Sequence, residues 1–439
     1  MRRKFKPIYL LAIPLLCLGV VIVYNLPFVH DRLAWRVDNL RMRIQYALNP
    51  PEQVVFVPEE QVQAIVNATL TALSPTVTPT QTPTPTATAP GPTDTPMPTA
   101  TPTLEPTPLP LAVRLEGVQY EDQHGRLNYC GPANLSMALT FWGWDGNRDV
   151  VGNAVKTNDQ DKNVMPYELQ DFVLSQGYGA IIRLGGEISL LQHLVANGFP
   201  VMAEKGYYTY DLTGRYGWLG HYQFVTGYDE TQQVLIVQDT YIDGGENHAF
   251  SYLDFTAGWR SFDYLFMVVY PLDREAQLLA LLGDWADADW AARHALELAQ
   301  AEVQSLTAID QYFAAYNVGS SHVALREYVD AGYAYDYAFQ LYAALGDDGL
   351  RPYRMMWYQT GPYFAYYYSG RYQDVIDLAN ATFDTIGDDV LEESFYWRGM
   401  GWFALGYADN AIADFREAVR LHPGFPPAVY QLEQLGVEP

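Results

Sequence analysis

The chain has 439 residues, of which 26 are basic and 51 are acidic, and its formal net charge is −25. At roughly 150 residues per domain this length allows two or three domains, and the 49% of hydrophobic residues excludes a wholly disordered chain. The acidity argues against a nucleic-acid-binding protein, because few basic groups remain to neutralise phosphates. The presence of only two cysteines excludes a disulfide framework and any cysteine-rich metal centre.

The N-terminus has the composition of a membrane anchor. Residues 7–29 carry no charge and are mostly apolar, and four basic residues precede them. A helix needs about 20 apolar residues to cross a bilayer, and the position of the basic residues favours a cytoplasmic N-terminus. We therefore predict a transmembrane anchor within residues 1–29, with all later residues outside the cytoplasm. The alternative is a cleaved signal peptide, although residues 24–28 lack the small residues of a cleavage site.

A juxtamembrane segment, residues 30–73, and a stalk, residues 74–110, follow the predicted anchor. Four arginines between positions 32 and 43 are expected to hold a short helix against anionic lipid headgroups. The stalk contains 12 prolines and 13 threonines and almost no side chain that a core could bury. Such a composition favours extended polyproline II structure, which spans about 3.1 Å per residue. We interpret the stalk as a spacer at the cell surface.

Residues 111–272 mix strand-like and helix-like patterns, which predicts an α+β domain. Within this domain Cys130 precedes Gly131 and Pro132, and apolar residues then recur at the three- and four-residue spacing of an amphipathic helix. Proline suits the first helical position, so we expect Cys130 at or just before the helix N-terminus. The helix dipole there favours the thiolate, which is the nucleophilic form of cysteine. The alternative is a buried and inert cysteine.

A thiolate nucleophile needs a base, and His221 is the strongest candidate. It opens a strand-like run over residues 222–228, and a second run over residues 234–238 ends in Asp239. If a three-residue loop joins the two strands, His221 lies directly opposite Asp239, which can then orient the imidazole. A slip of one residue would instead put the two side chains on opposite faces. The other histidines of the domain are expected in loops or on a helix face: His124, His193 and His248.

Together these segments resemble a papain-fold cysteine peptidase. The most similar family is the double-glycine (bacteriocin) leader peptidase-like family, cysteine-peptidase family thirty-nine, in its stand-alone bacterial form. The resemblance rests on Gln123, on Cys130-Gly131-Pro132-Ala133, on Gly220-His221-Tyr222 and on Val237-Gln238-Asp239. It implies that Cys130 is the nucleophile, that His221 is the general base and acid, and that Asp239 orients His221. It also implies that Gln123 donates a hydrogen bond to the oxyanion.

Residues 273–439 predict an all-α domain of tetratricopeptide-like repeats. The clearest copy of the 34-residue pattern holds Trp397, Gly399, Ala411 and Phe415 at the expected spacing. Two weaker copies lie upstream, the first with Gly319, Ala331, Tyr335 and Ala338 and the second with Trp357, Gly370, Tyr372 and Ala379. Such arrays usually bind peptides or proteins on a concave face.

A tyrosine-rich run in this domain has two interpretations. Tyr363, Tyr366, Tyr367 and Tyr368 either line the concave face or fill gaps between helices. Additional helices are expected near residues 273–305, before the first repeat.

The sequence therefore predicts a membrane-anchored, extracytoplasmic cysteine peptidase that hydrolyses peptide bonds through a Cys–His–Asp triad. Its fold would be an α+β papain-like domain followed by the helical-repeat domain, which would bind a substrate or a protein partner. The sequence implies no metal, no organic cofactor and no nucleic-acid partner. Two alternatives stay open, namely a catalytically silent peptide-binding module on a surface scaffold and acyl transfer to amines.

Overall fold

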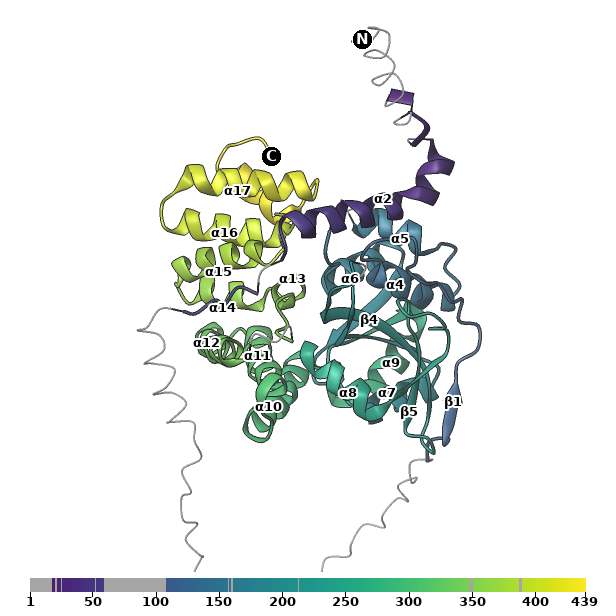
Figure 1. Cartoon of the computed structure of the whole chain (residues 1–439). Coiled ribbons are helices and arrows are strands. Elements are labelled where there is room, and N and C mark those ends of the chain that lie inside the picture. The colour runs from purple at the N-terminus through teal and green to yellow at the C-terminus, as the bar shows by residue number, and fades with distance from the viewer. Residues whose placement is uncertain are drawn as a thin grey trace, which may run out of the picture.

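Figure 1 shows a computed structural model of the chain, in which an α/β half and a helical half lie side by side. The structure describes residues 18–19, 22–24, 26–51, 53–58, 108–156, 158, 161–211, 213–346, 350–386 and 389–439. Most of the predicted anchor and most of the predicted stalk lie outside these ranges. No helix within them is both long enough and apolar enough to span a membrane.

One antiparallel sheet forms the centre of the α/β half. In the part of the chain that the structure describes, this sheet has seven strands. Six of them take the order β2-β7-β3-β4-β5-β6, and the seventh, β1, pairs with β4. The strands are β1 (Ala112–Arg114), β2 (Tyr178–Arg183), β3 (Val201–Tyr210), β4 (Tyr216–Asp229), β5 (Val234–Gln238), β6 (His248–Ser251) and β7 (Phe266–Pro271). The helices of this half are α4 (Cys130–Phe141), α5 (Arg148–Val155), α6 (Pro166–Ser175), α7 (Ile188–Ala196), α8 (Tyr252–Trp259) and α9 (Glu275–Leu282), with 3-10 turns η1 (Arg260–Phe262), η2 (Leu272–Arg274) and η3 (Gly283–Ala286).

The helices cover both faces of the sheet and create two separate cores. On one face α4, α5 and α6 pack Leu135 and Phe172 against Phe224 of β4. On the other face α7, α8 and α9 pack Leu194 and Phe255 against the opposite side of the sheet. This arrangement confirms the predicted α+β class, and it places the first turn of α4 beside the central strand β4.

The helical half confirms the prediction that the C-terminal region is helical. Its helices are α10 (Ala288–Ser305), α11 (Ala308–Ala324), α12 (Tyr328–Ala344), α13 (Met355–Tyr358), α14 (Gly361–Tyr368), α15 (Tyr372–Asp384), α16 (Glu392–Ala404), α17 (Ala408–Leu421) and α18 (Pro426–Gln434). Three adjacent pairs, α11–α12, α14–α15 and α16–α17, fall where the three repeat copies were expected. Small residues allow the close approach within a pair, since a side chain at Gly399 would collide with Phe415. The tetratricopeptide assignment itself stays a prediction.

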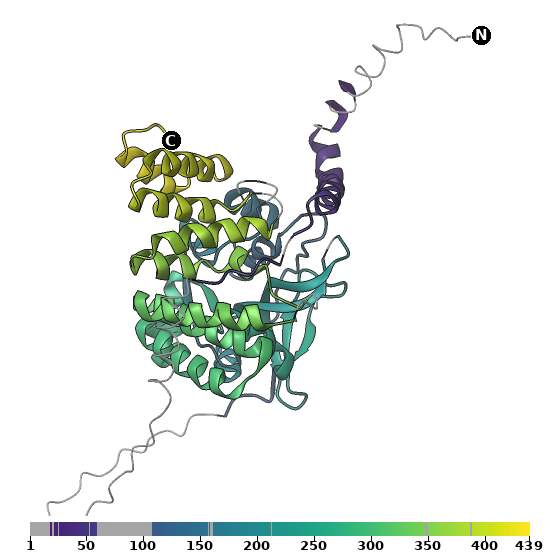
Figure 2. The ribbon, with the colours of Figure 1, turned by 60° about the vertical axis from the view of Figure 1, so that its left-hand side comes forward.

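The two halves join through a buried arginine. Arg354, which directly precedes α13, is 2% exposed, and it donates hydrogen bonds to the Trp218 carbonyl at 2.9 Å and to Asp211 at 2.7 Å. The Trp218 ring stacks on Phe262 and meets Tyr358 of α13 edge-on. Figure 2 shows the helical half running along the side of the α/β half. The halves therefore share a packed and charged junction.

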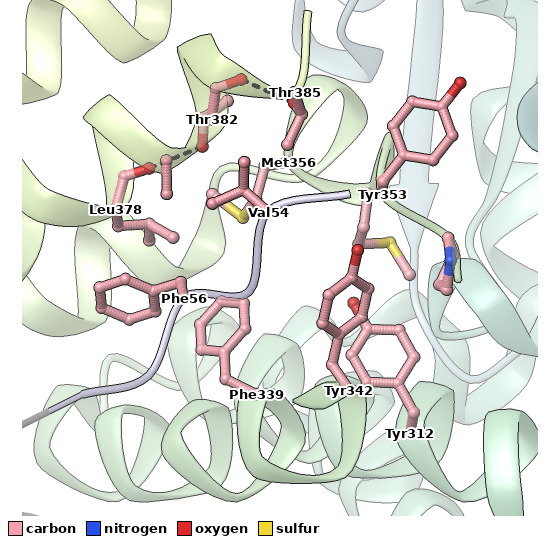
Figure 3. A pocket seen from close by; sticks show the side chains of 13 residues that line it. Val54, Phe56, Tyr312, Phe339, Tyr342, Tyr353, Met356, Leu378, Thr382 and Thr385 are labelled. Atoms are coloured by element: carbon pink, nitrogen blue, oxygen red, sulfur yellow. Dashed lines mark hydrogen bonds between the residues drawn. The ribbon is translucent and has the colours of Figure 1, made fainter. Parts of the chain in front are cut away.

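An N-terminal segment, residues 53–58, packs on the helical half. It follows α2 (Pro27–Leu48), whose first turns point away from the folded body in Figures 1 and 2. Phe56 is 9% exposed, and its ring lies 5.2 Å from the ring of Phe339. Figure 3 shows Val54 and Phe56 entering a pocket between helices of this half, beside Met356 and Leu378.

The tyrosine-rich run of α14 divides between its two interpretations. Tyr363 and Tyr366 are fully buried and fill the space between helices. Tyr366 also contacts the ring of Phe56, at 6.1 Å. Tyr368 is 55% exposed and stacks on Tyr328. Gap filling therefore describes the first two residues, whereas Tyr368 faces the surface.

Candidate active site

Cys130 is the first residue of α4. The helix begins two positions earlier than Pro132 alone would predict, so Pro132 is the third helical residue rather than the first. The change is small, because the first four N–H groups of a helix have no partner within it and a proline is tolerated there. Cys130 is a free, half-buried thiol. The N-terminal end of the helix dipole therefore acts directly on its sulfur.

Asn134 ties the start of α4 to β4. Its Nδ2 donates to the carbonyl of Cys130 at 2.8 Å and to the carbonyl of Tyr222 at 2.9 Å. Because Tyr222 follows His221 in the chain, this amide holds the cysteine and the histidine segments together. Our sequence reasoning missed Asn134, whose only signal was an amide side chain one helical turn after the cysteine, on a mostly apolar helix.

His221 lies between Cys130 and Asp239. The Nε2 atom of His221 is 3.1 Å from Oδ1 of Asp239, and both residues are buried, with 4% and 2% exposed. The imidazole also makes a hydrogen bond with the Cys130 thiol. Since Nε2 is engaged by Asp239, Nδ1 is the ring nitrogen left for the sulfur. The structure therefore brings together three of the four residues predicted for the site in one hydrogen-bonded row.

The hairpin that carries His221 and Asp239 differs from the prediction. The loop has four residues rather than three, since Asp229 pairs with Val234. A bulge between Val225 and Gly227 then shifts the register by one residue. Continuing this register sets Asp239 across from Gln223, so His221 reaches Asp239 diagonally. The bulge restores the facing of the two side chains that a four-residue loop alone would have reversed.

Asp239 accepts hydrogen bonds from several donors besides His221. Gln223 donates from Nε2 at 2.5 Å, and the backbone N–H of Tyr241 donates at 2.9 Å. Burial raises the pKa of Asp239, but the charge and hydrogen bond of His221, together with these donors, hold it well below its ordinary value. The carboxylate therefore stays ionised. Gln223 is a second residue that our sequence reasoning missed.

The electrostatics of the row favour an ion pair between Cys130 and His221. Burial raises the pKa of Cys130, but the hydrogen bond and the charge of His221 lower it by a larger amount. The pKa of the thiol therefore lies below its ordinary value. Burial lowers the pKa of His221, whereas Asp239 and Cys130 raise it to about 9. A low thiol pKa beside a high imidazole pKa favours thiolate and imidazolium at neutral pH.

Gln123, the fourth predicted residue, is buried in the loop before α4. Its backbone N–H donates to the carbonyl of Thr240 at 2.9 Å, and the Thr240 hydroxyl donates to its Oε1 at 2.9 Å. These two bonds tie Gln123 to the residue that follows Asp239. They also fix the amide, because Oε1 is occupied and Nε2 is the end left to donate.

Aromatic side chains surround the imidazole. The ring of Tyr207 lies 5.5 Å from the ring of His221, and the ring of Tyr241 lies 6.2 Å away. Tyr358 of the helical half packs beside Gly220, where an added side chain would collide with it. The helical half therefore contributes to the wall of the site.

Other polar residues of the α/β half lie on its strands, helices and loops. Glu204 and Lys205 are buried in β3. His124 is exposed, and His193 lies on α7 as expected. His248, by contrast, begins β6 rather than lying in a loop, because residues 248–251 pair with β5.

Comparison with known proteins gives a family match within the α/β half of the chain. Residues 115–266 match the family model described as Peptidase_C39 like family. This range contains all four predicted site residues, and the match supports a cysteine-peptidase fold of the papain-like type. A crystal structure of a C39-like peptidase from Bacillus anthracis is 17% identical in sequence, with a TM-score of 0.29; the similarity covers 36% of this chain and 96% of that chain. No curated protein matches the chain.

Proposed function

We propose that the protein is a cysteine peptidase that hydrolyses peptide bonds with Cys130, His221 and Asp239. One observation carries the proposal, namely the buried row in which the thiol at the start of α4 meets an imidazole that a carboxylate orients. This is the arrangement that nucleophilic catalysis needs, because a base activates the nucleophile and a third group positions the base. The family match over the same residues supports it.

In the first half of the reaction the Cys130 thiolate attacks the scissile carbonyl carbon and forms a C–S bond, while the carbonyl electron pair moves to oxygen. When this intermediate collapses, the C–N bond breaks and the His221 imidazolium gives its proton to the leaving amine. In the second half neutral His221 takes a proton from water, whose oxygen attacks the thioester. Release of the carboxylic acid restores the thiolate and the imidazolium.

Gln123 is the proposed oxyanion donor. Because the Thr240 hydroxyl occupies its Oε1, the Nε2 group is available to a developing negative charge. Loss of one such donor typically lowers kcat by about 100-fold or more. We therefore expect Gln123→Ala to reduce turnover by about that factor while leaving the ion pair of Cys130 and His221 intact.

The proposal includes attachment to a membrane with the folded halves outside the cytoplasm. The apolar and uncharged run over residues 7–29 supports an anchor. The helix α2 that follows carries exposed apolar residues along one stripe: Leu33, Val37, Leu40, Ile44 and Leu48. Apolar side chains at this spacing suit a helix that lies in the membrane interface.

The helical half is proposed to bind the substrate or a protein partner. Its pocket holds part of an extended segment of the chain itself, residues 53–58, and this packing supports the proposal that the half binds a peptide. A peptide with aromatic or branched residues at alternate positions, like Val54 and Phe56, fits this chemistry. Such a ligand would compete with the chain's own segment.

The test of the proposed nucleophile is the pH dependence of iodoacetamide labelling at Cys130. All variants carry Cys17→Ser, so that Cys130 is the only thiol. We expect rapid labelling at pH values well below the ordinary thiol pKa. In His221→Ala the labelling should require alkaline pH, because burial then raises the thiol pKa without a compensating charge. Slow labelling that rises only at alkaline pH in both proteins would contradict the proposal.

The two other candidate functions are separated by product analysis. Incubation with a peptide library should release new N-termini if the protein is a hydrolase. Peptide–amine adducts formed in the presence of a primary amine would indicate acyl transfer instead. A protein that labels rapidly and binds peptides but forms neither product would be a silent binding module.

A further inference from the structure

Four carboxylates and one histidine from both halves meet at the junction, outside the row that holds Cys130. Asp161 and Glu168 come from the α/β half, and Glu392, Glu393 and His422 come from the helical half. The two groups lie far apart in the sequence, so only the fold brings them together. A hydrogen bond of 3.2 Å from Asn158 to the carbonyl of Leu421 joins the same two segments.

Three of these side chains have the spacing of metal ligands. Nδ1 of His422 lies 3.1 Å from Oε1 of Glu392 and 3.7 Å from Oε1 of Glu168. One ligand atom from each residue lies within 4.8 Å of the other two. Zn²⁺ bonds of about 2.0 Å in a tetrahedral site put neighbouring ligand atoms about 3.3 Å apart. The distances from Nδ1 of His422 to the two carboxylate oxygens are close to this value. Small movements of the three side chains would therefore place their ligand atoms around an ion.

The cluster contains a buried oxygen that no group in the described parts of the chain satisfies. Glu392 is 3% exposed, and its Oε2 atom has no hydrogen-bond partner among the residues that the structure describes. Leaving such an oxygen unpaired is unfavourable, because it has lost water without gaining a donor. The Glu168 and Glu392 carboxylates also bring like charges to the same place, since one oxygen of each lies within 4.8 Å of the other.

We propose that Glu168, Glu392 and His422 bind a divalent transition-metal ion, of which Zn²⁺ is the best match, with water as the fourth ligand. An imidazole with two carboxylates suits Zn²⁺, whereas Ca²⁺ prefers a shell of oxygen atoms alone. Because Glu168 belongs to α6 while Glu392 and His422 belong to the helical half, the ion would fasten the two halves together. The proposal does not depend on peptidase activity.

The experiment is calorimetric titration of the full-length chain in detergent, after removal of metals with a chelator. Cys17→Ser and Cys130→Ser are present throughout, so that no thiol competes for the ion. We expect one Zn²⁺ per chain, a higher thermal midpoint with Zn²⁺, and no comparable effect of Ca²⁺. Co²⁺ in place of Zn²⁺ should give the visible absorption of a tetrahedral site.

Glu392→Gln and His422→Gln are the test variants. Mutation of a residue that only hydrogen-bonds to a metal ligand typically weakens metal binding by roughly 10- to 100-fold. Loss of a direct ligand should weaken Zn²⁺ binding by more than this. Glu392→Gln should fold as well as the parent without metal, because it removes a buried charge of like sign. Glu327→Gln is the matched control, since it alters an exposed cluster of similar composition, His322, Glu327 and Asp330.

The outcomes are distinct. Stoichiometric binding that Glu392→Gln abolishes and Glu327→Gln preserves supports the site. Absence of stoichiometric binding, or binding that only Glu327→Gln weakens, overturns it. A metal-free chain whose thermal midpoint does not change with Zn²⁺ would mean that shared protons, rather than an ion, neutralise the cluster.

Discussion

Asp239 influences chemistry through His221 rather than by touching a substrate. Asp239→Asn keeps the shape of the side chain but removes the charge that raises the pKa of His221 to about 9. The imidazolium then loses its proton at lower pH, and the thiolate loses its counterion. We expect turnover to fall by about 100-fold or more, a size typical of lost general acid–base function, and the alkaline limb of the pH–rate profile to move to lower pH.

Asp243→Asn provides the matched control for this prediction. Asp243 lies four residues further along the chain, and its side chain is fully exposed. The substitution should leave turnover and the pH profile unchanged. Equal effects of the two substitutions would show that Asp239 has no special role.

Lys205 makes stability depend on pH. It lies opposite His221 on β3, and its ammonium sits 3.6 Å from the Phe250 ring centre without a hydrogen-bond partner in the described parts of the chain. Burial lowers its pKa from about 10.5 to about 7. Between these values the unfolded chain binds more protons than the folded chain, so the free energy of unfolding rises with pH.

We therefore expect Lys205→Met to raise the free energy of unfolding at pH 7 and to flatten its rise toward pH 10. Urea denaturation of both proteins across this range measures the effect. A stability difference that is constant with pH would mean that Lys205 does not titrate between the two values.

At the scale of elements, the helix start and the two strands of the proposed site were predictable, but their register was not. Cys130 precedes an apolar helix, and His221 and Asp239 border two adjacent strand patterns. The bulge that aligns them lies where β1 packs closely on β4, since a side chain at Gly227 would collide with the carbonyl of Val113. A contact between segments so far apart in the sequence leaves no local signal in the hairpin.

The exposed stripe of α2 predicts membrane association even without the anchor. Leu40 and Ile44 are 59% and 53% exposed on this helix. Replacing both by Gln in a fragment of residues 27–439 should weaken binding to anionic vesicles by about 10-fold or more, because burying each side chain is worth roughly 1.5–3 kcal/mol. Vesicle sedimentation measures the partition.

Exposed leucines elsewhere give the control. Leu253 and Leu272 are 79% and 59% exposed on the α/β half. Replacing these two by Gln changes hydrophobicity by a similar amount but should leave vesicle binding unchanged. If both pairs weaken binding equally, α2 is not the membrane-facing element.

At the scale of the whole molecule, Arg354 joins the two halves. Arg354→Ala would leave Asp211 and the Trp218 carbonyl without their donor in a buried place. Breaking a buried pair in this way typically costs about 3–5 kcal/mol. We expect a loss of this size in denaturant unfolding, while Arg326→Ala, which breaks an exposed pair with Asp289, should cost at most about 1 kcal/mol.

The presence of two folded halves was predictable from composition, but the contacts between them were not. A switch from mixed patterns to an Ala-, Leu- and Tyr-rich sequence near residue 273 indicates the helical half. In contrast, the cluster of Glu168, Glu392 and His422 joins positions more than two hundred residues apart, and none of the three stands in a recognisable ligand motif. Its members become visible only once the halves are docked.

The docking of residues 53–58 changes what the proline- and threonine-rich stalk can do. Phe56 fixes the chain before the stalk to the helical half. Tyr228 donates to the carbonyl of Pro110, and β1 pairs with β4, which fixes the chain after it to the α/β half. A segment whose two ends are held on one body is a closed loop and not a tether. The distance from a membrane to the folded halves would then be set by α2 and the few residues after it, and the loop could vary in length without moving them.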